Sequence, residues 1–167
     1  GAGTAIPVFS LRSEDDFGVG EFLDLKKMVD WAEKTGQCIL QLLPINDTTM
    51  TGTWEDSYPY NANSTFALHP QFVNLKAAGV VESKEYKALQ KDLNSLSQVD
   101  YERVNNEKTK LLREAFAKTF AKLSKTAAYK AFVASSKEWL EPYAVFCCLR
   151  DSFGTAEFAK WKTYAKY

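Results

Sequence analysis

The run CILQLLP at residues 38–44 decides the fold class predicted for this chain. It follows Gly36 closely, ends at Pro44 and is almost entirely apolar. A short apolar run between a glycine and a proline is typical of a strand that is buried on both faces of a parallel sheet. We therefore expect such a strand over residues 38–43.

A second strand and a helix are expected upstream of this run. The apolar residues within 4–11 predict a short buried strand. Helical spacing predicts a helix over residues 21–35, with Glu21 in its first turn and Gly36 as its stop. The apolar stripe of that helix is Phe22, Leu25, Val29 and Ala32. Strand, helix and strand fill about 40 residues, which is the length of a right-handed βαβ unit and indicates an α/β sheet or barrel.

The Gly18-Val19-Gly20 turn between the first strand and the helix has two interpretations. A dinucleotide-binding turn needs G-x-G-x-x-G and an acidic residue about 20 residues further on. Here Leu23 stands at the third glycine position and Pro44 ends the next strand. A tight turn from strand to helix is therefore favoured over a nucleotide site.

The chain is expected to divide into an α/β unit over residues 1–76 and a mostly α-helical subdomain over residues 77–167. Ser83 is a suitable cap for the first helix of the subdomain, and Gly154 for the end of the last long one. The expected helices are 83–93, one starting at Asn105 or Asn106 with Leu123 on its apolar face, 127–135, 142–153 with Pro142 in the first turn, and a short one holding Phe158 and Trp161. The aromatic stripes expected in their core are Phe116, Phe120, Tyr129, Phe132, Trp139, Tyr143 and Phe146.

Residues 45–70 form the most informative stretch for function. They show little regular pattern, and a loop longer than about 15 residues within a compact domain is usually functional. Trp54, Tyr58, Tyr60 and Phe66 stand there among Asn, Ser, Thr and acidic residues. Rings mixed with short polar groups suit a neutral polyol, whose apolar C–H faces stack on them. The alternative is a structured loop whose rings pack inward.

Other titratable residues of this loop have weaker functional interpretations. Asp47, Glu55 and Asp56 are carboxylates, but nothing in the sequence shows the pair separation of about 5–5.5 Å that a retaining glycosidase needs. We expect them to be solvated or to cap turns. His69 precedes Pro70 without a partner Ser or Cys, so a structural histidine is favoured.

Composition excludes several classes of partner. Twenty-one Lys and Arg residues balance 21 Asp and Glu residues, which provides neither the basic surface of a nucleic-acid binder nor a polybasic membrane anchor. Cys38, Cys147 and Cys148 have no zinc-ligand spacing with the single histidine. They are expected to be reduced, buried thiols of a cytoplasmic protein.

Several motifs resemble the start of the catalytic domain of the 4-α-glucanotransferases, the amylomaltase or disproportionating-enzyme family. The similar segments are Ile6–Ser13, Asp16–Leu25, Gln41–Ile45 and Ser57–Pro70, and the similarity is close over residues 4–75. Residues 53–57 and 144–167 resemble the branch of the family that acts on heteroglycans and maltose.

This resemblance implies an incomplete (β/α)₈ barrel with helical insertions and transfer of α-1,4-glucan segments between maltodextrins, with retention and without a cofactor. By motif match, Tyr60 falls on the tyrosine that lines the donor-sugar subsite, and Ser57 supports its loop. With Tyr58 and Trp54 they are the expected substrate-binding residues of the donor-site loop, residues 45–70. The family usually reads Ser-Pro-Tyr there, whereas this chain has one residue more.

The resemblance also implies what this chain does not contain. Nothing in it resembles the arginine–x–aspartate segment that carries the family's nucleophile, and a barrel needs about 250 residues. We therefore expect the opening segment of a longer enzyme, without catalytic residues or a metal site and inactive alone. Unpaired strand edges predict self-association. The alternative is a free-standing carbohydrate-binding or protein-interaction module.

Overall fold

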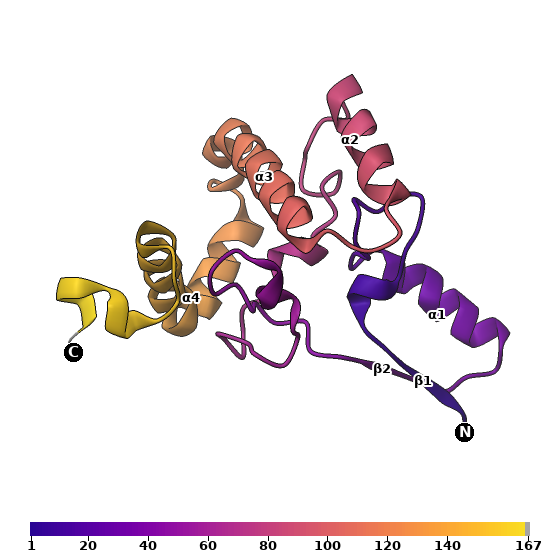
Figure 1. Cartoon of the computed structure of the whole chain (residues 1–167). Helices are drawn as coiled ribbons and strands as arrows, with labels where there is room; N and C mark the ends of the chain where they lie inside the picture. The colour runs from indigo at the N-terminus through magenta and orange to yellow at the C-terminus, as the bar shows by residue number, and fades with distance from the viewer. Residues whose placement is uncertain (166–167) are drawn as a thin grey trace.

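The computed structural model describes residues 1–165, so the last two residues of the predicted helical subdomain, 166 and 167, lie outside the described residues. The chain is mixed α/β and mostly helical, with one small parallel sheet (Figure 1). The elements in chain order are β1 (Gly3–Ile6), η1 (Val8–Ser10), α1 (Asp24–Lys34), β2 (Ile39–Leu42), η2 (Trp54–Ser57), η3 (Pro70–Phe72), α2 (Lys84–Ser95), α3 (Tyr101–Leu123), α4 (Ala127–Phe153), η4 (Phe158–Lys160) and η5 (Lys162–Ala165).

The predicted strand–helix–strand unit is present. β1 and β2 pair in parallel from Gly3 opposite Ile39 to Ile6 opposite Leu42, with α1 between them in the chain. The first strand is shorter than predicted, because Pro7 has no N–H to donate and the chain turns into η1. The second strand lies within the predicted range.

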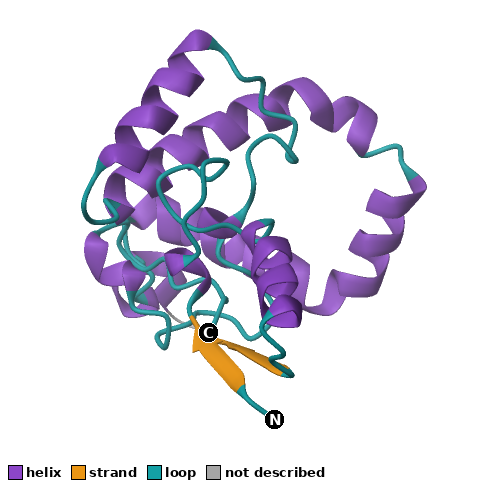
Figure 2. Cartoon of the chain, turned by 90° about the vertical axis from the view of Figure 1, so that its right-hand side faces the viewer, coloured by secondary structure: helices purple, strands orange, loops and turns teal. Residues whose placement is uncertain are grey.

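The prediction that β2 is buried on both faces is wrong for this chain. Its residues alternate between exposed and half-buried, and Ile39 is 62% exposed. The reason is that each strand has only one neighbour among the described residues, and the pair lies at one edge of the molecule (Figure 2).

The Gly18–Gly20 turn is filled by protein, which supports the tight-turn interpretation. Gly18 has a φ of 80°, and a Cβ there would lie 2.8 Å from the Cβ of Leu93 and 2.9 Å from Cγ2 of Val104. A Cβ on Gly20 would lie 2.1 Å from the Val8 carbonyl oxygen. Both glycines therefore allow close packing of the turn against its neighbours.

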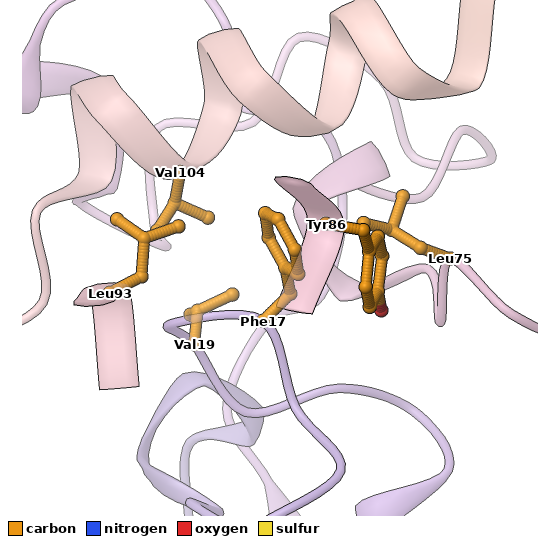
Figure 3. Packing of buried hydrophobic residues seen from close by; sticks show 6 residues of the cluster. All are labelled: Phe17, Val19, Leu75, Tyr86, Leu93 and Val104. Carbon is orange, nitrogen blue, oxygen red and sulfur yellow. The ribbon is translucent and has the colours of Figure 1, made fainter. Parts of the chain in front are cut away.

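The hydrophobic core joins this turn to the helical half of the chain (Figure 3). Phe17 and Val19 are fully buried, and the Phe17 ring lies 5.0 Å from that of Tyr86 on α2. The buried residues of this core cluster are Phe17, Val19, Leu75, Tyr86, Leu93 and Val104. Its members come from both sides of the predicted division at residues 76 and 77, which stays a prediction.

A buried ion pair crosses the same interface. The Lys108 ammonium of α3 donates to Glu21 Oε1 at 2.5 Å and to the Gln71 carbonyl at 2.6 Å. The Asn74 amide donates to the second Glu21 oxygen at 2.7 Å. Burial raises the pKa of Glu21 and lowers that of Lys108, in each case against the attraction of the partner. The prediction that Glu21 lies in the first turn of the helix is wrong, because α1 begins at Asp24.

The helical half matches the prediction in its elements more than in its boundaries. Ser83 caps α2 as predicted, accepting a hydrogen bond from the Tyr86 amide. The predicted start of α3 at Asn105 or Asn106 is wrong, since Asp100 caps it by accepting from Arg103 N. This start lies about one turn earlier and places Val104 in the core.

The two helices predicted over 127–135 and 142–153 are one continuous helix, α4, with Pro142 inside it. A proline within a helix removes one hydrogen bond to the carbonyl four residues earlier. That residue, Glu138, is exposed, so water can satisfy the carbonyl. The predicted stop is confirmed: Gly154 ends α4 with a left-handed φ of 67°.

Two predictions about burial in this half are wrong. Phe116 and Phe132 are each more than half exposed rather than in the core, although other aromatic residues of the stripes pack together, such as Tyr143 with Phe146. Cys38 and Cys148 are exposed rather than buried, and all three cysteines are free thiols. The last predicted helix is two short 3₁₀ turns, η4 and η5.

Removal of the Lys108 charge tests the contribution of the buried ion pair. Lys108→Met leaves Glu21 as an uncompensated buried carboxylate, which should lower the free energy of unfolding by about 3–5 kcal/mol. Urea denaturation of the chain measures the loss. The matched control is Lys110→Met on the exposed face of α3, which should change stability by less than about 0.5 kcal/mol. Equal effects of the two substitutions would contradict the assignment.

Candidate functional site

The segment over residues 45–70 is a loop whose two ends are fastened together. It begins just beyond the carboxyl end of β2, where α/β folds place ligands. Asn46 and Leu68 form an antiparallel bridge, and the His69 and Asp47 amides donate to the Ile45 and Ala67 carbonyls at 2.9 Å. The loop therefore leaves and re-enters the fold through one hydrogen-bonded base.

The outer part of the loop presents aromatic rings to solvent. Trp54 is 68% exposed, and Tyr58 and Tyr60 are each 61% exposed. The Tyr58 and Tyr60 rings lie 5.6 Å apart between centroids at an angle of 51°. Ser57, the last residue of η2, directly precedes Tyr58 in the sequence and is half-buried. The alternative that these rings pack inward is wrong for the described chain.

Asp47 holds the inner part of the loop in place. Its Oδ1 accepts hydrogen bonds from the Thr49 amide at 3.0 Å and the Thr49 hydroxyl at 2.6 Å. Its Oδ2 accepts from the Tyr143 hydroxyl at 2.5 Å and from Arg150 Nη1 at 3.4 Å, both on α4. Burial raises the pKa of Asp47, but the hydrogen bonds from Thr49 and Tyr143 outweigh it, so the net pKa lies below the usual value.

Asp56 organises the turn that precedes the exposed rings. Its carboxylate accepts from the amides of Thr51 and Gly52, the latter at 2.7 Å, and its carbonyl accepts from the Thr48 hydroxyl. Glu102 of α3 accepts from the Trp54 amide at 2.9 Å. Asp47 and Asp56 are thus buried rather than solvated, and both bind turns of the loop; Glu55 is exposed.

His69 lies buried at the base of the loop. Its Nδ1 accepts from the Gln71 amide at 3.1 Å, so the neutral ring carries its proton on Nε2. Nε2 has no hydrogen-bond partner within the described part of the chain and lies 4.0 Å from Asp47 Oδ1. Burial lowers the pKa of His69 despite the nearby carboxylates of Asp47 and Asp56. The arrangement is that of a neutral structural histidine.

A groove of about 1140 Å³ lies behind the loop, between it, α3 and the end of α4. Met50, Asp56, His69, Phe116 and Arg150 are among its lining residues. None of the described lining residues is Trp54, Ser57, Tyr58 or Tyr60. The predicted sugar-facing residues therefore lie on the outer surface of the loop rather than in this groove.

Two residues that hold the loop were not assigned to it from sequence. The sequence pattern places Tyr143 in an aromatic core stripe and indicates no role for Arg150. Both follow the loop by roughly a hundred residues in sequence, and their contacts with Asp47 arise only from the packing of α4. The available signal was a single arginine on an otherwise apolar helical segment, AVFCCLR.

Comparison with known proteins identifies the family. The sequence profile described as 4-alpha-glucanotransferase matches residues 6–167, which includes both the loop and the helical half. This chain belongs to the 4-alpha-glucanotransferase family. The family match thus extends well beyond residues 4–75, where the resemblance is closest by motif.

Individual relatives differ greatly from this chain in length. The 4-alpha-glucanotransferase DPE2 of rice (Oryza sativa subsp. japonica) is 43% identical over 100% of this chain but only 18% of that protein. A 4-alpha-glucanotransferase of Chlamydia muridarum is 37% identical over 96% of the chain and 31% of its own length. A 4-alpha-glucanotransferase of Thermus thermophilus is 28% identical over 87% of this chain and 28% of its own length. The chain therefore spans less than a third of each of these relatives.

The described residues contain no group of three or more His, Cys, Asp and Glu side chains that could hold a metal ion. Within residues 1–165, no helix combines the length and the apolar character needed to cross a bilayer.

The pH dependence of stability tests the buried, neutral state of His69, which is the only histidine of the chain. Its folded pKa lies below the unfolded value of about 6.5, so the folded chain binds fewer protons below that pH. The stabilisation is complete above pH about 6.5 and is lost as the pH falls toward the folded pKa. Asp47, Asp56, Arg150 and Lys108 supply the surrounding charge.

We expect the stability difference between the native chain and His69→Asn to shrink as the pH falls from 7 to 5. Asparagine retains an acceptor near Nδ1 but does not titrate, which makes it the matched comparison. Unfolding in urea at several pH values measures both curves. Parallel curves for the two proteins would show that His69 is not the titrating group.

Proposed function

We propose that this chain supplies part of the donor-sugar site of a 4-α-glucanotransferase, an enzyme that transfers α-1,4-glucan segments between maltodextrins with retention of configuration. The observation that carries the proposal is the exposure of Trp54, Tyr58 and Tyr60 on a loop with a hydrogen-bonded base. Family membership supports glucan transfer, and the relatives are named 4-alpha-glucanotransferases.

The chemistry of the loop suits an uncharged glucan. Large rings left in water on one segment indicate a binding surface, because burial of their apolar area by a ligand is favourable. Glucose units offer apolar C–H faces to Tyr58 and Tyr60 and hydroxyl groups to the short polar residues around them. Tyr60 is proposed to line the donor subsite, with Tyr58 and Trp54 extending the surface and Ser57 supporting it.

The reacting carboxylates are proposed to lie in the part of the full enzyme outside this chain. A retaining enzyme needs two carboxyl groups about 5–5.5 Å apart and free to act. Asp47 and Asp56 are committed to hydrogen bonds within the loop, and Glu55 is exposed on its surface. The relatives are more than three times as long as this chain, which leaves ample sequence for the catalytic residues.

β1 and β2 are proposed to be the first two neighbouring strands of a (β/α)₈ barrel. Their parallel pairing, with α1 between them in the chain, is what such a barrel requires. In this arrangement residues 1–76 form the start of the barrel with its donor-site loop, and residues 77–167 form the helical insertion. A cytoplasmic location is proposed because the three cysteines are free thiols.

Activity of the isolated chain tests the assignment of the catalytic residues. Incubation of residues 1–167 with maltotriose should leave the trisaccharide unchanged, since the chain lacks the proposed carboxylates. Neither longer nor shorter oligosaccharides should form. Chromatography of the products provides the measurement. Robust disproportionation by the chain alone would overturn this part of the proposal.

Substitution of Tyr60 in the full-length enzyme tests the sugar-binding surface. Loss of an aromatic contact worth about 1.5–3 kcal/mol should lower kcat/KM for maltodextrin transfer by about 10- to 100-fold in Tyr60→Ala. Tyr164→Ala is the matched control, because that tyrosine is as exposed but packs near Phe153 at the other end of the chain. Unchanged kinetics of Tyr60→Ala would reject the role of Tyr60.

Self-association of the isolated chain is expected through the unpaired outer edges of β1 and β2. Exposed Ile39 adds apolar surface at the same place. Sedimentation velocity should show dimers or larger species as the concentration increases. Ile39→Lys should reduce them, since a charged edge residue disfavours pairing. Monomeric behaviour of the unmodified chain at high concentration would contradict the expectation.

A further inference from the structure

Helix α4 approaches the donor-site loop closely enough to fix its conformation. The Tyr143 hydroxyl donates to Asp47 Oδ2 at 2.5 Å, and Arg150 Nη1 donates to the Thr49 carbonyl at 3.3 Å. The amide of Ala156, just after the helix, donates to the Met50 carbonyl at 2.9 Å. Asp47, Thr49 and Met50 of the loop are thus bound by α4 and by the residues just after it.

The same helix also contacts the returning arm of the loop. The Phe66 ring stacks on Trp139 with centroids 5.7 Å apart and an angle of 16°. Trp139 and Tyr143 lie one helical turn apart on α4, so a single face of the helix touches both arms. The exposed rings at Trp54, Tyr58 and Tyr60 lie between these two anchored parts.

Asp47 is the residue on which these contacts converge. It is 4% exposed, and its carboxylate links the loop to α4 while its backbone closes the base. A hydrogen bond that a charged acceptor receives in a buried place is among the stronger ones available to a protein. Loss of the Tyr143 hydroxyl would therefore weaken the attachment of the inner part of the loop to α4 without removing any group from its outer surface.

We propose that Asp47, Tyr143 and Arg150 are positioning residues for glucan binding: through them, α4 holds the loop so that Tyr60 and its neighbours meet the donor sugar. This inference rests on the proposed function of the loop. It assigns a role in donor recognition to a helix that lies outside the donor-site loop in sequence. Arg150 contributes by a second contact, since it binds both Asp47 and the Thr49 carbonyl.

The kinetic test uses Tyr143→Phe in the full-length enzyme, because this change removes one oxygen and keeps the ring. A loosened loop must become ordered when the donor binds. This cost weakens binding of the donor in the ground state as well as in the transition state. We expect kcat/KM for maltodextrin to fall roughly 10- to 100-fold, mainly through a higher KM for the donor. Partial unfolding would instead lower kcat at an unchanged KM.

Tyr129→Phe is the matched control. It also removes a tyrosine hydroxyl from α4, but its ring packs against Phe120 of α3 rather than against the loop. We expect its kinetics to match those of the unmodified enzyme. Asp47→Asn is a second variant at the other end of the same hydrogen bond and should reproduce the rise in KM. Hydrogen exchange at the Thr49 amide should be faster in Tyr143→Phe and in Asp47→Asn than in the unmodified enzyme.

A double-substitution cycle separates positioning from general stability. If Tyr143 acts through Tyr60 and its neighbours, the effect of Tyr143→Phe on kcat/KM should be smaller in a Tyr60→Ala background than in the unmodified enzyme. Multiplicative effects of the two substitutions, or an unchanged KM in both Tyr143→Phe and Asp47→Asn, would overturn the inference while leaving the proposed function intact. Unchanged kinetics of Tyr60→Ala alone would instead remove the proposed function on which it rests.

Discussion

The buried contact between Lys108 and Glu21 connects parts of this chain that lie far apart in the sequence. Glu21 follows the turn after β1, Gln71 and Asn74 follow the loop, and Lys108 lies on α3. A buried charge is costly unless it is paired and hydrogen-bonded, so these groups are held in one arrangement. The aromatic core of Phe17 and Tyr86 then packs beside a polar junction that fixes the relative position of all three segments.

The loop over residues 45–70 depends on that junction at its base. The Gln71 carbonyl accepts a hydrogen bond from the Lys108 ammonium, and the Gln71 amide donates to His69 at the end of the loop. Hydrogen bonds from the backbone to Asp47 and Asp56 organise the inner part of the loop without any regular secondary structure. A rigid interior of this kind allows the outer rings to stay in water rather than collapse onto the protein.

The packing of the helical half against the loop brings α4 into contact with a segment that lies far away in the sequence. The family profile covers both halves of the chain, and α4 contacts both arms of the loop. Pro142 lies within α4 between Trp139 and Tyr143, where an interruption of the helix would separate these two contacts. The continuous helix is therefore what allows one element to hold the loop at two places.

Features that local chemistry controls can be predicted from the amino-acid sequence alone. The strand–helix–strand unit follows from hydrophobic spacing and from glycine and proline, and the ends of α2 and α4 follow from the Ser83 cap and from Gly154. The aromatic residues of the loop and the family motifs can also be recognised directly in the sequence. Each of these signals lies within a few residues of the structure that it predicts.

The burial of polar groups against one another depends on tertiary packing and cannot be predicted from local sequence. Glu21 and Lys108 are 87 residues apart and Asp47 and Tyr143 are 96 apart, and neither separation leaves a local pattern. Tertiary packing also placed Phe17 in the core, kept α4 continuous through Pro142 and left Ile39 exposed. The physical reason is that burial depends on neighbours brought together by the whole chain, whereas spacing and caps report only on the nearest turn.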